Sequence, residues 1–106
     1  MMPNNRRQDN RIAANLPVEI CLGSQVTIHG QLKDISSKSA FIRMKSSAFM
    51  QMNDELNFLI RCSAGESQDA VVGVARISRI AVGEGIAIYF TQMDQTSSSR
   101  LKQLIG

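Results

Sequence analysis

The sequence predicts an all-β fold: a six-stranded antiparallel barrel with a short C-terminal helix and a flexible N-terminal arm. Six segments between residues 16 and 90 alternate apolar and polar side chains, the pattern of strands that bury one face. Short stretches rich in Gly, Ser and Asp separate these segments, so consecutive strands can pair as hairpins. Many short strands at regular spacing are typical of barrels. After the last strand the apolar spacing becomes that of a helix.

The first fifteen residues, MMPNNRRQDNRIAAN, contain almost no periodic apolar positions, and their proline and asparagines disfavour regular structure. We therefore expect residues 1–15 to form a flexible basic arm and residues 16–106 to form the barrel, a single domain in a chain of 106 residues. Three arginines against one aspartate give the arm most of the chain's formal net charge of +3. The charged residues of the arm are Arg6, Arg7, Asp9 and Arg11.

The first two strands are expected to form a hairpin. Alternation runs over residues 16–22, stops at the turn pair Gly23 and Ser24, and resumes over residues 26–33. One face of this hairpin is apolar and points to the core, and the other is polar. The apolar face carries Val18, Ile20, Leu22, Val26, Ile28 and Leu32.

The middle of the chain adds two strands and the longest loop. A polar turn over residues 34–39 leads into a third strand over residues 40–45, and residues 55–62 alternate again as a fourth strand. Between them, residues 46–54 form a loop whose apolar side chains we expect to pack against one end of the barrel. The apolar residues are Phe49, Met50 and Met52 in the loop and Leu56, Phe58 and Ile60 on the inner face of the fourth strand.

The C-terminal third contains two more strands and the helix. A turn over residues 64–68 precedes a β-branched run over residues 70–80, and a Gly-Glu-Gly connection leads to a final strand over residues 86–90. Asp94 can cap a helix that closes one end of the barrel. One face of this helix is apolar, and basic residues near its end complement the helix dipole. These residues are Leu101, Leu104, Ile105, Arg100 and Lys102.

The sequence disfavours an enzyme and a metal site. His29 is the only histidine and falls on the polar face of the second strand, so we expect a surface histidine. Cys21 and Cys62 are isolated, with no Cys-x-x-Cys pair, which leaves no ligand set for a structural metal. We expect both thiols to be inert and reduced, as in a cytoplasmic protein.

Membrane insertion and DNA binding are also disfavoured. The chain has no run of eighteen apolar residues, and no apolar stretch follows its basic start as in a secretory signal. With one Tyr, four Phe and no Trp, it has few aromatic surfaces on which bases could stack. A small anion is therefore a more natural partner for the basic arm than a long polymer.

Two short motifs remain. The arm carries two arginines four residues apart, Arg7 and Arg11, and the stretch DISSKS follows the second strand at residues 34–39. Taken singly, the first is typical of a solvated basic tail and the second of Asx and Ser/Thr turns. Only their combination and order point to a function.

In that order, the motifs resemble the PilZ domain family, whose pattern is RxxxR on an N-terminal loop followed by [D/N]xSxxG across a strand pair. The sequence matches at Arg7, Arg11, Asp34 and Ser36. The likeness extends over nearly the whole chain, through GQLKDIS, SAFI and GIAIYF, to the terminal helix. The family fold is a six-stranded barrel with a C-terminal helix, in agreement with the periodicity.

The resemblance implies a receptor that binds cyclic di-GMP, a bacterial second messenger with two guanines and two phosphodiesters, and relays the signal to a protein effector. An arginine offers a planar fork of donors for a phosphate or a guanine edge and can stack on a purine. Asp34 can accept from the guanine N1 and N2 donors, and Ser36 can hydrogen-bond a base edge or a phosphate. The implied ligand-binding residues are Arg6, Arg7, Arg11, Asp34, Ser36 and Ser39.

Two positions of the pattern bear on how the ligand is held. Ser39 stands where the family has glycine, so it must either adopt a positive φ at about 1 kcal/mol of strain or present its hydroxyl in the ligand's space. Arg6 precedes RxxxR, a position that in such domains influences whether one ligand or an intercalated pair is held. A guanidinium there can stack on an outer guanine or neutralise a phosphate, so we expect an intercalated dimer of cyclic di-GMP.

Two other functions stay open on the sequence. The first is a PilZ-like adaptor that binds only protein and not the nucleotide. The presence of both Arg7 and Arg11 favours the nucleotide receptor over it. The second is a small barrel that binds nucleic acid through its basic arm, and the low aromatic content counts against it.

Overall fold

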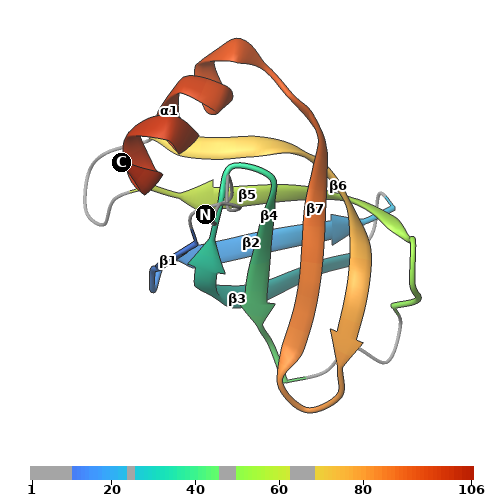
Figure 1. Cartoon of the computed structure of the whole chain (residues 1–106). Coiled ribbons are helices and arrows are strands. Elements are labelled where there is room, and N and C mark those ends of the chain that lie inside the picture. Colours follow the sequence, from blue (N-terminus) through green and yellow to red (C-terminus); the bar gives the residue numbers. More distant parts are fainter. Residues whose placement is uncertain (1–10, 24–25, 46–49, 63–68) are drawn as a thin grey trace, which may run out of the picture.

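The computed structural model of the chain describes residues 11–23, 26–45, 50–62 and 69–106. Within them, seven antiparallel strands and one helix are present (Figure 1). The sheet order is β1-β3-β2-β5-β6-β7-β4, and an additional β3–β4 pairing closes six strands into a barrel. The predicted six-stranded barrel with a C-terminal helix is confirmed, with β1 as an extra strand. The elements are β1 (Ile12–Ala13), β2 (Pro17–Leu22), β3 (Val26–Ile35), β4 (Ser39–Arg43), β5 (Glu55–Arg61), β6 (Ala70–Ala81), β7 (Gly85–Met93) and α1 (Gln95–Ile105).

Strand β1 is a feature that the alternation pattern did not indicate. It pairs with the last two residues of β3, with Ala13 opposite Asp34. A two-residue strand is too short to leave a period in a sequence. The C-terminal part of the arm expected over residues 1–15 is therefore tied to the barrel, whereas residues 1–10 lie outside the described residues.

The connection between β3 and β4 is shorter than the turn predicted over residues 34–39. Asp34 lies within β3, opposite Phe41 of β4, and Ser39 is the first residue of β4. A register shift between the two strands makes Lys33 the extra residue of a β-bulge. Sheet pairing rather than a loop therefore fixes the backbone at Asp34 and Ser39.

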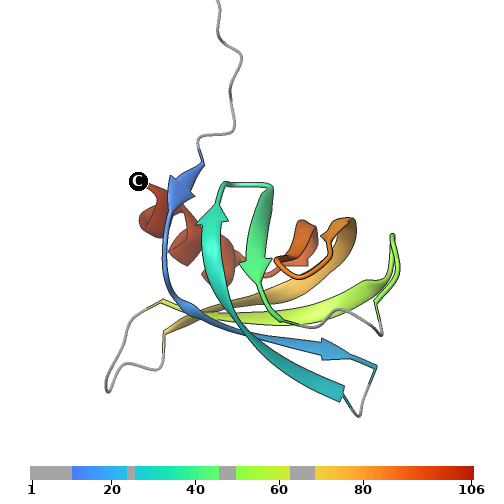
Figure 2. The ribbon, with the colours of Figure 1, turned by 90° about the horizontal axis from the view of Figure 1, so that it is seen from below.

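The barrel interior is filled by the apolar faces that the alternation predicts. Burial along β3 fades from Leu32, which is 1% exposed, to Val26, which is 41% exposed. The reason is that the β2–β3 hairpin projects past the rest of the barrel (Figure 2). Of the loop residues expected to pack on the core, Met50 is buried, Met52 is exposed and Phe49 lies outside the described residues. The buried core includes Val18, Ile20, Ile42, Leu56, Phe58, Ile60, Ile77, Ile86 and Ile88.

Helix α1 begins and packs as predicted. The N–H of Ser97 donates to Asp94 Oδ1 over 2.7 Å, which caps the first turn. Leu101 is buried in the core, and the other two apolar residues of its face pack beside it. The Ser97 hydroxyl accepts a hydrogen bond from the Val72 N–H of β6 over 3.0 Å. The helix is thus joined to the barrel both by apolar burial and by a polar contact.

Candidate functional site

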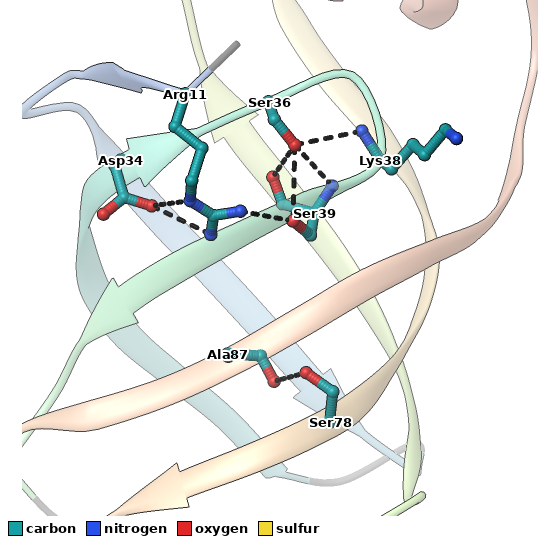
Figure 3. A network of polar contacts seen from close by, with 7 residues as sticks. All are labelled: Arg11, Asp34, Ser36, Lys38, Ser39, Ser78 and Ala87. Carbon is teal, nitrogen blue, oxygen red and sulfur yellow. Dashed lines mark hydrogen bonds and ion pairs between the residues drawn. The ribbon is translucent and has the colours of Figure 1, made fainter. Parts of the chain in front are cut away.

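Arg11, Asp34 and Ser39 form a polar cluster where β1, β3 and β4 meet (Figure 3). The Arg11 guanidinium contacts Asp34 Oδ1 through Nε at 3.1 Å and through Nη2 at 3.0 Å. Its Nη1 donates to Ser39 Oγ over 2.7 Å. The side chains of Arg11 and Asp34 remain 41% and 28% exposed. The cluster is therefore ordered by contacts within the protein and still open to a ligand.

Ser36 lies in the turn between β3 and β4, and its side chain is fully buried. Its Oγ accepts hydrogen bonds from the N–H groups of Lys38 and Ser39, at 3.2 Å and 3.1 Å (Figure 3). The N–H of Ser36 donates to the Ser39 carbonyl over 2.8 Å. In this conformation Ser36 shapes the turn that carries Ser39, and its hydroxyl does not reach the surface.

Replacing Ser36 by alanine is expected to lower the free energy of unfolding by about 1–3 kcal/mol, because two N–H groups of the turn lose their acceptor. Chemical denaturation measures this loss. Ser37→Ala is the matched control, since Ser37 is the exposed neighbour in the same turn and is expected to leave stability unchanged. Equal stability of the two variants would contradict the role assigned to Ser36.

The backbone at Ser39 is not strained, so the first of the two alternatives that the sequence left open there, a positive φ, does not occur. Among the described residues, Asn53 is the one non-glycine residue with a positive φ, at 68°. Ser39 belongs to β4, and strand geometry suits serine as well as glycine. The hydroxyl instead lies in the polar cluster, where it accepts a hydrogen bond from Arg11.

Beyond this cluster, two cations on the outer face cover an aromatic ring that is itself buried. Phe41 follows Ser39 by two residues on β4, so both side chains point to the same face. Lys33 Nζ lies 5.4 Å and Arg79 Cζ 5.6 Å from the centroid of the Phe41 ring. The two-residue period of a strand would have been enough to predict that Phe41 and Ser39 share a face. The two cations escaped the sequence patterns because Lys33 sits at a bulge and Arg79 follows a register shift between β6 and β7.

Two hollows lie along this outer face. One, of about 330 Å³, is lined by Lys33, Arg43 and the segment that follows β1. The other, of about 310 Å³, is lined by Lys33, Phe41, Arg43 and Glu84 among others. In the described part of the chain, Lys33, Arg43 and Arg79 form no ion pair. Phe41 itself is only 6% exposed, so this face offers a ligand its unpaired cations, which suit an anion.

The fold thus brings together four of the six residues that the sequence motifs pointed to. Three of the four share the polar cluster, and the fourth supports it from the buried side of the turn. The remaining two lie outside the described residues. The four are Arg11, Asp34, Ser39 and Ser36, and the two are Arg6 and Arg7.

The histidine and the cysteines lie apart from this cluster. His29 is exposed on β3, as expected. Cys21 and Cys62 are free and half-buried, and burial raises the pKa of the Cys62 thiol, which keeps it in its less reactive protonated form. The described residues contain no group of three or more His, Cys, Asp or Glu side chains that would hold a metal ion. The helix found in them, α1, is too short and too polar to cross a bilayer.

Comparison with known proteins identifies a family for this chain. The PilZ domain model matches residues 5–106 of the chain. This match spans both sequence motifs, every strand and the helix. No curated protein sequence gives a significant match.

The solved structures that share the fold include the following three. The inhibitor of motility MotI/DgrA from Bacillus subtilis superposes with a TM-score of 0.78 at 20% identity, over 94% of this chain and 49% of that one. The PilZ domain with c-di-GMP of YcgR from Escherichia coli has a TM-score of 0.72 at 16% identity, over 95% and 89%. The PilZ domain of CeSA from a cellulose-synthesizing bacterium has a TM-score of 0.68 at 23% identity, over 91% and 94%. The chain therefore spans about half the length of the motility inhibitor and most of the other two.

Proposed function

Because the chain belongs to the PilZ domain family, whose members are regulatory binding domains and include cyclic di-GMP receptors, we propose that it binds cyclic di-GMP at the Arg11–Asp34–Ser39 cluster and relays the signal to a protein effector. The observation that carries the proposal is the placement of Arg11 beside Asp34 and Ser39 on one exposed face. The two motifs, more than twenty residues apart in the chain, thus meet at one point of the surface. Calorimetric titration with cyclic di-GMP tests it.

The contacts of Arg11 leave it free to bind a ligand. Three of its five N–H donors are directed at Asp34 and Ser39, which orient the guanidinium. The remaining two donors and the planar faces are available for a phosphate or a guanine. Asp34 Oδ1 receives both contacts from Arg11, and Oδ2 has no hydrogen bond within the described residues, so it can accept from guanine N–H groups.

The rest of the outer face matches the ligand in charge. Lys33 and Arg79 both lie over the Phe41 ring, and Arg43 lines both adjoining hollows. Cyclic di-GMP carries two phosphodiesters and two purines. The cations supply counter-charge for the first, and the planar arginine guanidinium groups can stack on the second. Arg7 and Arg6 complete the site in this proposal, as the sequence motif implies.

Ser39 acts here as a positioning residue for Arg11. Ser39→Ala is expected to weaken ligand binding by roughly fivefold, equivalent to about 1 kcal/mol, because the guanidinium loses the acceptor that orients it. Ser39→Gly gives the same loss, since there is no strain to relieve. Ser39→Thr retains a hydroxyl and keeps the affinity. Calorimetry that finds the alanine variant as tight as the unmodified protein would remove this role.

Stoichiometry is the next expected outcome. We predict two molecules of cyclic di-GMP per chain, as an intercalated pair, with Arg6→Leu shifting the ratio toward one. Two ligands bring four phosphodiester charges into a small volume, so an additional cation offsets a repulsion that one ligand does not create. Lys102→Leu, on the exposed side of α1, is the control and keeps the ratio. A ratio of one for the unmodified protein rejects the pair and leaves the receptor proposal intact.

The proposal includes the setting of the protein. It acts in the cytoplasm, where its two free thiols stay reduced, and it works by binding rather than by catalysis. Its output is a contact with a protein effector and not with DNA or a membrane. The competing hypothesis is an adaptor that binds protein and no nucleotide. If titration with cyclic di-GMP gives no heat of binding and no competition at any concentration, the adaptor hypothesis is favoured.

A further inference from the structure

The first half of β3 has an open edge. On one side, β3 pairs with β2 over residues 26–31. On the other side, β4 pairs with it only from Gln31 to Ile35. Over residues 26–30, β3 therefore has a single neighbouring strand in the described part of the chain. An open edge of this kind offers backbone donors and acceptors to another strand.

The direction of the peptide groups identifies what this edge offers. The Leu32 N–H donates to the Leu16 carbonyl, toward the side on which β2 lies. Successive residues of a strand direct their N–H and C=O groups to opposite sides. The N–H and C=O of Ile28 therefore also point to β2, and those of Thr27 and His29 point away from it. The peptide groups of Thr27 and His29 thus face outward without a strand partner among the described residues.

The path of β4 explains why the edge opens. At Gly30 the two strands come so close that a Cβ atom would lie 2.6 Å from the Arg43 carbonyl oxygen and 2.9 Å from Ile42 Cγ2. Beyond that crossing, the Met44 N–H donates to the Glu84 carbonyl over 3.1 Å, in the β6–β7 turn. The chain after β4 is thus drawn to that turn and away from β3.

A groove of about 540 Å³ occupies the space between the β3 edge, the end of β4 and the β6–β7 turn. This volume falls within the roughly 300–1,000 Å³ typical of ligand sites. Ile28 and Met44 supply apolar lining, and His29 borders it on the side of the open edge. A strand added to β3 would lie about 4.8 Å from it and thus inside the groove.

The charges around the groove select its occupant. Arg43 and Lys45 line it, and Glu84 is the one acidic residue among the described lining residues. Neither cation forms an ion pair in the described part of the chain. Pairing with a second copy would bring two such basic grooves together, which like-charge repulsion opposes. An extended segment with acidic side chains has the complementary charge.

We propose that this edge is a docking site at which an extended acidic segment of a partner protein adds a strand to β3. Backbone hydrogen bonds to Thr27 and His29 supply affinity, and Arg43 and Lys45 supply the preference for acidic side chains. The site lies at the opposite end of β3 and β4 from Asp34 and Ser39. Arg43 borders both sites, whereas His29 and Lys45 line only the groove at this edge. Variants at His29 and Lys45 therefore test the edge alone, and either proposal can fail without the other.

Fluorescence anisotropy with the ligand-free protein tests the edge. The probe is a labelled short peptide of alternating valine and glutamate. His29→Pro removes one outward N–H at a strand edge, where proline is tolerated, and is expected to weaken peptide binding by at least roughly tenfold. His29→Ala is the matched control, because it removes the imidazole, keeps the N–H and retains the affinity. The same peptide with alternate N-methylated residues loses binding too, which keeps the test decisive if the proline variant fails to fold.

The preference for acidic side chains is tested separately. Lys45→Glu is expected to weaken binding of the acidic peptide about threefold, and Lys102→Glu on α1 to leave it unchanged. A valine–lysine peptide binds more weakly than the acidic one. Equal binding of the two peptides, equal binding by the proline and alanine variants, or no binding at all overturns the proposal. So does a dimer of the chain in sedimentation that His29→Pro abolishes, which would make a second copy the occupant.

Discussion

Arg11→Ala is expected to weaken binding of cyclic di-GMP by about ten- to a hundredfold, since a hydrogen bond to a charged group contributes roughly 1.5–3 kcal/mol. Arg11 is the residue at which both sequence motifs meet, through its contacts with Asp34 and Ser39. Calorimetry of the purified variant measures the change. Arg7→Ala is expected to show a loss of the same size, as the RxxxR pattern implies.

Arg61→Ala is the matched control for Arg11. Arg61 also donates to a surface carboxylate, that of Glu19, at 3.1 Å, and it belongs to β5 rather than to the site. Both variants remove one partly exposed ion pair, which contributes only about 0–1 kcal/mol to stability. Both are therefore expected to fold normally, and only Arg11→Ala should lose ligand. Unchanged affinity in Arg11→Ala rejects the proposed site.

Gly85→Ala is expected to lower the free energy of unfolding by about 3 kcal/mol or more. A Cβ atom at this position would overlap the carbonyl oxygen of Ile42. That oxygen belongs to the backbone of β4, opposite the start of β7, so it cannot rotate away as a side chain would. The two strands must therefore separate at the end of β4. Denaturant titration followed by circular dichroism measures the loss.

Gly83→Ala is the control for Gly85→Ala, because it changes the turn geometry without a steric clash. Gly83 has φ +81°, and no other atom lies within 4 Å of the position that a Cβ would occupy. Alanine there meets only the backbone preference, about 1 kcal/mol. A loss at Gly85 no larger than the loss at Gly83 would show that the approach of β4 to β7 is not what requires glycine.

The sequence by itself determined the six barrel strands, the helix and the family. Alternation located the inward residues Leu56, Phe58 and Ile60, and all three are buried. Asp94 marked the start of α1, where it caps the helix. These features are local: a strand with one buried face must repeat every two residues, and a helix N-terminus needs an acceptor for its free N–H groups. The motif residues could also be predicted, because the motifs are defined by residue types at fixed spacings along the chain.

Only the tertiary structure decided how distant segments align. The contact of Arg11 with Asp34 depends on β1, which is too short to leave a period. The cations beside Phe41 depend on a bulge in β3 and a register shift between β6 and β7.

The buried role of Ser36 and the extended backbone of Ser39 follow from where β4 begins. The open edge of β3 follows from where the chain after β4 turns away. Strand register and bulges are set by packing between segments far apart in the chain, and no short stretch of sequence contains that information.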